Sequence, residues 1–321
     1  MYPKINTAAP EKAGQVMMTD KIIRATGEVA ELRFVLVDAT AAANAVGGFH
    51  AAHGYARVLL GETLVSSLLL ASGLKTNGTV QVKFQFSGDF SLATADATPM
   101  GLLRGMIPAA DLKRTGDFEP LLAPQTMTVR KLNERGSPIS ESIVEMPSEY
   151  AGPNTSYYLL QSEQTKSAVG IKAQANADGT ALDFCGGYLV EAFPKADEKT
   201  LAIMEQVVQS LPPISNYHRP GEGLDLGELL ADLAGPFRYT VHRELPVQPF
   251  CPCSSTGVMK ALSGLPREEL EDVALRQETM ELHCDYCRKR YQATPDQVRD
   301  LLEKMDASPE PEEPDGDAPG S

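Results

Sequence analysis

Four cysteines lie in two close pairs in the last quarter of the chain. Cys251-Pro252-Cys253 forms a CxC motif, and Cys284-Asp285-Tyr286-Cys287 forms a CxxC motif after 30 intervening residues. Zinc prefers a tetrahedral set of thiolates, and each short loop can present two sulfurs to one ion while the intervening segment folds back. The spacing therefore predicts one Zn²⁺ per chain, bound by Cys251, Cys253, Cys284 and Cys287.

Two roles are open for such a site. The spacing alone favours a structural zinc knuckle that keeps its metal, because short Cys pairs of this kind are typical of structural sites. A thioredoxin-like role for the CxxC is weakly supported, since no βαβ pattern surrounds it. A redox switch remains possible, because adjacent thiolates can also pair with each other under oxidant and deprive zinc of its ligands.

The other residues that could take part in chemistry are better explained by structural roles. Cys185 stands in an apolar, strand-like run, which predicts an inert core residue. His50 and His53 lack a third metal ligand nearby, and His283 adjoins a site that four cysteines already complete. The Ser162-Glu163-Gln164 run has no matching His and Asp constellation, and no phosphate-binding GxxxxGK[ST] loop occurs. The sequence thus predicts no catalytic residues and a protein that is not an enzyme.

The helices and strands expected along the chain indicate an α+β fold. The length of 321 residues predicts two domains. Residues 1–195 read as a mixed sheet-and-helix domain. A hairpin is expected over residues 21–37, and a wide apolar face predicts a buried helix from Ala56 until Gly78. Residues 80–86 alternate apolar and polar side chains, which is typical of a strand with one buried face. Further strands are expected at residues 127–132, 143–146, 169–173 and 182–190, with a helix at 154–162.

The rest of the chain changes character. Residues 196–246 read as a helical connector, with one helix that starts at Asp197 and another that Asp225 caps. Residues 247–305 form the small cysteine-bearing domain and include a charged helix at 266–275. Residues 306–321 contain six acids, four prolines and no large aliphatic side chain, which predicts a disordered acidic tail.

Composition excludes several classes of function. Lys and Arg number 29 against 43 Asp and Glu, and the formal net charge of -14 works against sequence-independent binding of nucleic acid. Residues 1–15 contain no apolar run that could serve as a signal peptide, so we expect a cytoplasmic protein. The most apolar stretch, residues 58–74, is shorter than a bilayer span and contains Glu62. No membrane partner is expected.

Several segments together resemble the redox-regulated holdase chaperones called heat shock protein 33. The resemblance covers nearly the whole chain up to the tail. After Cys253 the family usually has an Arg-Glu pair, whereas this chain reads Ser254-Ser255-Thr256-Gly257. The segments that carry the resemblance are FCPCS at 250–254, HCDYCRKRY at 283–291, YYLLQSEQT at 157–165, HGYARVLLGETLVSSLLLASGLK at 53–75 and CGGYLVEAFP at 185–194.

The resemblance implies an ATP-independent chaperone that is inactive while reduced and zinc-bound. Oxidation of the four paired cysteines would release zinc, unfold the small domain and let the protein hold unfolding or oxidatively damaged client proteins, with a possible homodimer in the oxidised form. We expect oxidation to join nearest neighbours, Cys251 with Cys253 and Cys284 with Cys287, because loop closure favours the shortest pairing. The alternative is a binding module with a permanent structural zinc that recruits a protein partner.

Overall fold

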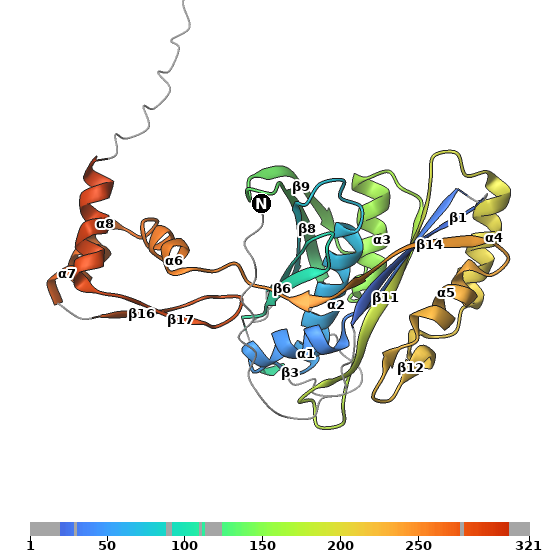
Figure 1. Cartoon of the computed structure of the whole chain (residues 1–321), viewed down its shortest axis with the longest axis horizontal. Coiled ribbons are helices and arrows are strands. Elements are labelled where there is room, and N and C mark those ends of the chain that lie inside the picture. Colours follow the sequence, from blue (N-terminus) through green and yellow to red (C-terminus); the bar gives the residue numbers. More distant parts are fainter. Residues whose placement is uncertain are drawn as a thin grey trace, which may run out of the picture. The chain divides into compact units, whose positions relative to one another are not determined.

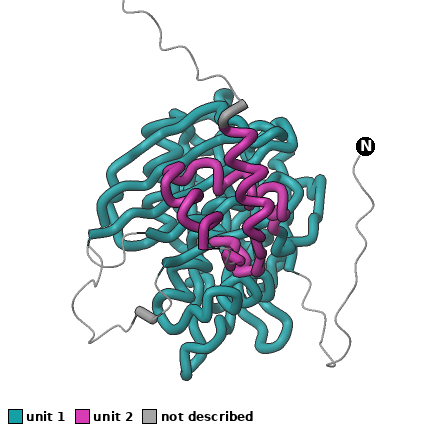
Figure 2. The backbone as a smooth tube through the Cα atoms, turned by 90° about the vertical axis from the view of Figure 1, so that its left-hand side faces the viewer, with its two compact units in different colours: residues 1–250 teal, residues 251–321 magenta. Residues whose placement is uncertain are grey.

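The chain forms two compact units, residues 1–250 and residues 251–321 (Figure 2). The structure is a computed structural model, and it describes residues 20–28, 31–87, 92–108, 111–112, 124–276 and 279–307. The predicted connector, residues 196–246, belongs to the first unit. Most of the predicted disordered tail lies outside the described residues, but its first two residues complete a helix that ends at Ala307.

A five-stranded antiparallel sheet forms one layer of the first unit (Figure 1). The predicted hairpin at residues 21–37 is confirmed as its two strands β1 and β2. The edge strand β14 was not predicted, because the sequence analysis assigned its residues to a helical connector. The strands in spatial order are β10 (Ser167–Ala175), β11 (Leu182–Ala192), β2 (Leu32–Asp38), β1 (Lys21–Gly27) and β14 (Tyr239–Pro246).

A six-stranded sheet forms a second layer. Its strand β4 buries every second side chain, which confirms the alternation predicted for residues 80–86. The short strand β15 pairs in parallel with β6, whereas the other pairs are antiparallel. The strands in spatial order are β15 (Gln248–Pro249), β6 (Leu102–Met106), β5 (Leu92–Ala97), β4 (Thr79–Phe86), β8 (Pro124–Leu132) and β9 (Pro138–Glu145).

Helix α2 (Tyr55–Ala71) lies between the two sheets and is buried on nearly every side (Figure 1). A helix with apolar side chains on every side needs such a position to bury them. The predicted end at Gly78 is wrong, because the Ser72 hydroxyl donates to the carbonyl of Leu69 and Gly73 turns the chain away. Beside α2 lie α1 (Thr40–Phe49), α3 (Ala151–Ser162) and a short pairing of β3 (His53–Gly54) with β7 (Asp111–Leu112).

The five-stranded sheet is apolar on both faces. One face joins the core around α2, and the other carries a second core that residues 198–237 cover. Asp225 caps its helix as predicted, since the carboxylate accepts from the backbone N–H of Glu228 at 2.9 Å. The covering elements are α4 (Glu198–Ser210), the 3-10 helix η1 (Ile214–Tyr217), the hairpin β12 (His218–Arg219) and β13 (Gly223–Leu224), and α5 (Leu226–Ala234).

One carboxylate links this covering segment to the sheet. Asp38, at the end of β2, accepts a hydrogen bond from the backbone N–H of Leu224 at 2.9 Å and from the Thr40 hydroxyl at 2.6 Å. Gly223 has a positive φ of 84°, and a Cβ atom there would lie 2.2 Å from Asp38 Oδ2. The close approach of the hairpin to Asp38 therefore requires glycine at position 223.

Glu62 is a buried carboxyl group within α2. Burial raises its pKa from 4.5 to about 7, although Lys172 and the backbone N–H groups of Ala173 and Ala151 act against the rise. The folded protein therefore holds a proton on Glu62 that the unfolded chain releases near pH 4.5. Between these two pKa values the native state binds more protons, so folding stability falls as pH rises.

We expect Glu62→Gln to flatten this pH dependence, because the neutral amide needs no proton to be buried. Thermal unfolding at pH 5 and pH 8 should show that the unchanged protein loses on the order of 3 kcal/mol more stability than the variant, which keeps the loss due to Asp20, a second buried carboxyl whose pKa is raised to about 7. Glu205→Gln removes an exposed carboxylate and serves as the control. An equal loss in all three proteins would show that Glu62 is not the group that titrates.

The second unit is small, and its core contains few side chains. Its hairpin and helices are β16 (Met280–His283), β17 (Arg290–Ala293), α6 (Ser255–Leu262), α7 (Arg267–Arg276) and α8 (Pro295–Ala307). Helix α7 confirms the charged helix predicted at residues 266–275. The buried apolar residues are Leu262, Leu270, Ala274, Ala293, Val298 and Leu302. A core of this size gives a domain little stability without a further cross-link.

No helix among the described residues is long and apolar enough to cross a membrane.

Candidate metal centre

Two loops of the second unit carry the four clustered cysteines. Cys251 and Cys253 precede α6, where Ser254 caps the helix by accepting from the backbone N–H of Gly257 at 3.1 Å. Cys284 and Cys287 lie in the turn between β16 and β17. The Ser254 cap fixes the direction in which the chain leaves the CxC loop.

The turn between the strands has a tight backbone. The N–H of Cys284 donates to the carbonyl of Lys289 at 3.0 Å, and the N–H of Arg288 donates to the carbonyl of Cys284 at 2.9 Å. Arg288 has a positive φ of 56°. This left-handed conformation is costly for a residue with a Cβ atom. The two backbone hydrogen bonds of the turn hold it in place.

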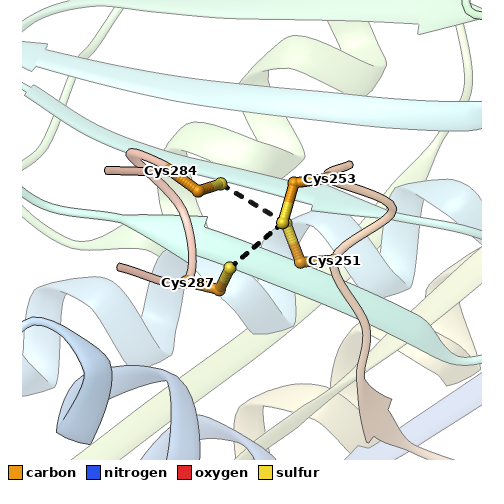
Figure 3. Close-up of side chains that lie close together, drawn as sticks. All are labelled: Cys251, Cys253, Cys284 and Cys287. Atoms are coloured by element: carbon orange, nitrogen blue, oxygen red, sulfur yellow. Dashed lines mark hydrogen bonds between the residues drawn. The ribbon is translucent and has the colours of Figure 1, made fainter. Parts of the chain in front are cut away.

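The four sulfurs point toward one another from the two loops (Figure 3). They lie within 4.8 Å of one another, with Cys251 Sγ 3.7 Å from Cys284 Sγ and Cys253 Sγ 3.4 Å from Cys287 Sγ. All four are free thiols. Sulfurs that bind one tetrahedral ion at about 2.3 Å lie about 3.8 Å apart, which the observed contacts approach. The donor set and its spacing therefore fit a metal ion.

The thiols of this cluster differ in pKa. Partial burial alone would raise the pKa of Cys253, but hydrogen bonds from Tyr291 and from the neighbouring thiols outweigh it and lower the pKa to about 7. Burial raises the pKa of Cys287 to about 12, and the neighbouring thiols add to this rise. Cys253 therefore ionises more readily than Cys287, and several thiolates so close together would repel one another without a cation.

Tyr291 is the residue that the sequence analysis missed. Its hydroxyl donates to Cys253 Sγ at 3.1 Å, and the Lys289 ammonium lies 5.4 Å from the centre of its ring. Tyr291 reaches the cluster because β17 pairs with β16, which places it opposite Leu282. The only signal in the sequence was its position four residues after Cys287.

The remaining candidate residues are not members of the cluster. Cys185 is completely buried in β11, as predicted, and burial raises its pKa. His50 is buried beside the carbonyl of Gly105, whereas His53 is exposed in β3. His283 is exposed at the end of β16. Among the described residues, only the four paired cysteines form a group able to hold a metal.

Glu163 has a structural role at the end of α3. It accepts a hydrogen bond from the Tyr158 hydroxyl at 2.6 Å and pairs with Lys131 at 2.5 Å. These contacts agree with the expected helix end rather than a catalytic group.

Comparison with known proteins identifies the family that this chain matches. The family model described as Hsp33 protein matches residues 20–294. The chain is 30% identical over 296 residues to the 33 kDa chaperonin of Pelobacter propionicus, covering 89% of this chain and 95% of that protein. It is 29% identical over 302 residues to the 33 kDa chaperonin of Desulfotalea psychrophila, covering 90% of this chain and 99% of that protein.

A solved structure has the same fold. The crystal structure of the 33 kDa chaperonin of Thermotoga maritima, a heat shock protein 33 homologue, aligns with a TM-score of 0.77 at 21% sequence identity. The alignment covers 90% of this chain and all of that chain.

Proposed function

Because the chain belongs to the Hsp33 family, we propose that it is an ATP-independent holdase chaperone that oxidation of its clustered cysteines switches on. The observation that carries the proposal is the convergence of four free thiols within 4.8 Å in a unit with a small core. The expected clients are unfolding or oxidatively damaged proteins in the cytoplasm, and the oxidised form is a possible homodimer.

The four cysteines are proposed to bind one Zn²⁺ per reduced chain. Four thiolates are a preferred zinc donor set, and the spacing of their sulfurs suits a tetrahedral ion. When bound, the ion neutralises the thiolates and cross-links the two loops. Because six buried apolar side chains support the second unit, its folding should depend on this cross-link.

Oxidation would remove that cross-link. Each disulfide consumes two thiolates, which lose two electrons to the oxidant and can no longer act as strong ligands. Pairing of nearest neighbours, Cys251 with Cys253 and Cys284 with Cys287, remains our prediction. The observed contacts join cysteines of different loops, but all four sulfurs are already close, so proximity in the reduced form does not decide the pairing.

A large apolar surface lies beneath the segment that precedes the second unit. Residues 198–237 cover one face of the five-stranded sheet over its strands β1, β2 and β11. If the covering segment loosens once the second unit unfolds, this face becomes available to clients, since large exposed apolar patches bind other proteins. The sheet residues on this face are Ile23, Ala25, Leu32, Phe34, Leu36, Phe184, Tyr188 and Val190.

The test compares reduced protein with peroxide-treated protein in one assay of aggregation suppression, with released zinc measured in the same sample. We expect no suppression and bound zinc before treatment, then suppression together with zinc release. Retention of zinc and no suppression under peroxide would instead favour a binding module with a permanent structural zinc.

Arg288 offers a second test of the zinc site. Arg288→Gly should relieve the left-handed backbone strain and stabilise the folded, zinc-bound turn by up to about 1 kcal/mol, which is roughly a fivefold gain in zinc affinity. Competition with a coloured chelator measures this gain. Arg290→Gly removes the same charge from β17 and should weaken binding, because glycine destabilises a strand. Equal effects of the two variants would contradict the strain argument.

A further inference from the structure

Tyr291 gives the four sulfurs unequal surroundings. Its hydroxyl donates a hydrogen bond to Cys253 Sγ at 3.1 Å, and this sulfur also contacts Cys287 Sγ, whereas Cys284 Sγ contacts Cys251 Sγ. The phenol is held in β17, whose register with β16 fixes its direction. Cys253 is therefore the thiol that a neighbouring hydroxyl group engages directly.

We propose that Tyr291 protects Cys253 from oxidation and thereby sets the order in which the two cysteine pairs oxidise. When the site is loaded, all four sulfurs are thiolates, so they differ in how their lone pairs are engaged rather than in charge. A charge-assisted hydrogen bond draws electron density from the thiolate that accepts it and makes it a poorer nucleophile. This inference rests on the proposed oxidative switch.

The reaction concerned is attack on a peroxide. A thiolate sulfur of Cys284 or Cys287 bonds to one peroxide oxygen, the O–O bond breaks, and the other oxygen leaves as hydroxide and takes up a proton to form water. The sulfur is now a sulfenic acid. The second thiolate of the pair attacks this sulfur, the S–O bond breaks, and hydroxide leaves as the disulfide forms. The pair loses two electrons and the peroxide gains them.

Lys289 strengthens the effect of Tyr291. Its ammonium lies 5.4 Å from the centre of the Tyr291 ring, within the range of a cation–π interaction. A cation over the ring withdraws electron density from the phenol, so its O–H becomes a stronger donor. Lys289 thus acts on Cys253 through Tyr291, and both are positioning residues.

The experiment uses the full-length, zinc-loaded protein and a limiting amount of hydrogen peroxide. Tyr291→Phe keeps the ring and removes the hydroxyl group. Peptide mapping of singly oxidised chains should show mainly the Cys284–Cys287 bond in the unchanged protein. In the variant, the share of chains with a Cys251–Cys253 bond should rise roughly three- to tenfold. Lys289→Gln should shift the share in the same direction by less, and Arg290→Gln, with the same loss of charge, should not shift it.

The ratio of the two bonds separates protection from a merely structural role. A variant that only loosens the site would release zinc faster, with or without peroxide, and leave the ratio unchanged, which would overturn the inference. The proposed switch would then still stand, provided that the unchanged protein forms disulfides and releases zinc under peroxide. If the unchanged protein forms no disulfide under peroxide, both the switch and this inference are wrong.

Discussion

Serine at any one of the four clustered cysteines is expected to abolish stoichiometric zinc binding. A serine hydroxyl is a poor zinc ligand, and loss of a group that merely supports a ligand already lowers metal affinity roughly ten- to a hundredfold. Loss of a ligand should therefore lower it by more than about a hundredfold. Because the core of the second unit is small, the same variants should lose the fold of residues 251–307.

Cys185→Ser is the matched control. Its sulfur is buried in the first unit and does not belong to the cluster, so zinc content should stay at one per chain. The buried hydroxyl should lower the stability of the first unit by about 1–3 kcal/mol. Metal analysis of the five variants, with hydrogen exchange over residues 251–307, measures both effects. Zinc loss in Cys185→Ser equal to that of the other four would show that the site is misassigned.

Gly223→Ala is expected to release the covering segment without any oxidant. The left-handed backbone costs an alanine about 1–2 kcal/mol, and its Cβ would collide with Asp38 Oδ2. Asp38 must then move and lose its hydrogen bond to Leu224, which costs about 1–3 kcal/mol more for a buried polar group. The reduced, zinc-loaded variant should bind an apolar dye and suppress aggregation.

Gly221→Ala separates the cost of the left-handed backbone from the cost of the collision with Asp38. Its φ of 82° imposes the same backbone cost, but no atom lies within 4 Å of the added Cβ. This variant should be clearly less active than Gly223→Ala while both retain zinc. Equal dye binding by the two variants would mean that the contact with Asp38 does not hold the segment in place. Loss of zinc from Gly223→Ala would mean that the variant acts through the second unit instead.

Local patterns predicted those features that depend on nearby residues. The strand at residues 80–86 buries alternate side chains because its pattern has a period of two, and Asp225 caps a helix because the N–H it serves is three residues away. The cysteine cluster was predictable because thiols in close pairs have few other uses in one small domain. Each of these signals lies within a short stretch of sequence.

Features set by partners distant in sequence were not predictable in this way. Strand β14 buries only Leu245, so its place depends on backbone pairing with β1 and not on a buried face of its own. Tyr291 meets Cys253 only because two strands pair in a particular register. Neither contact follows from the spacing of residues along one segment.

The few residues before Cys251 connect the two sheets of the first unit. Strand β14 ends at Pro246 in the five-stranded sheet, and β15 begins at Gln248 in the six-stranded sheet. The N–H groups of Val247, Gln248 and Phe250 donate to the carbonyls of Asp20, Gly101 and Leu103. Disorder that spreads backward from Cys251 must therefore break these bonds in sequence before it reaches β14. Brief local unfolding at the cysteines therefore leaves β14 in place, and only sustained unfolding of the second unit reaches it.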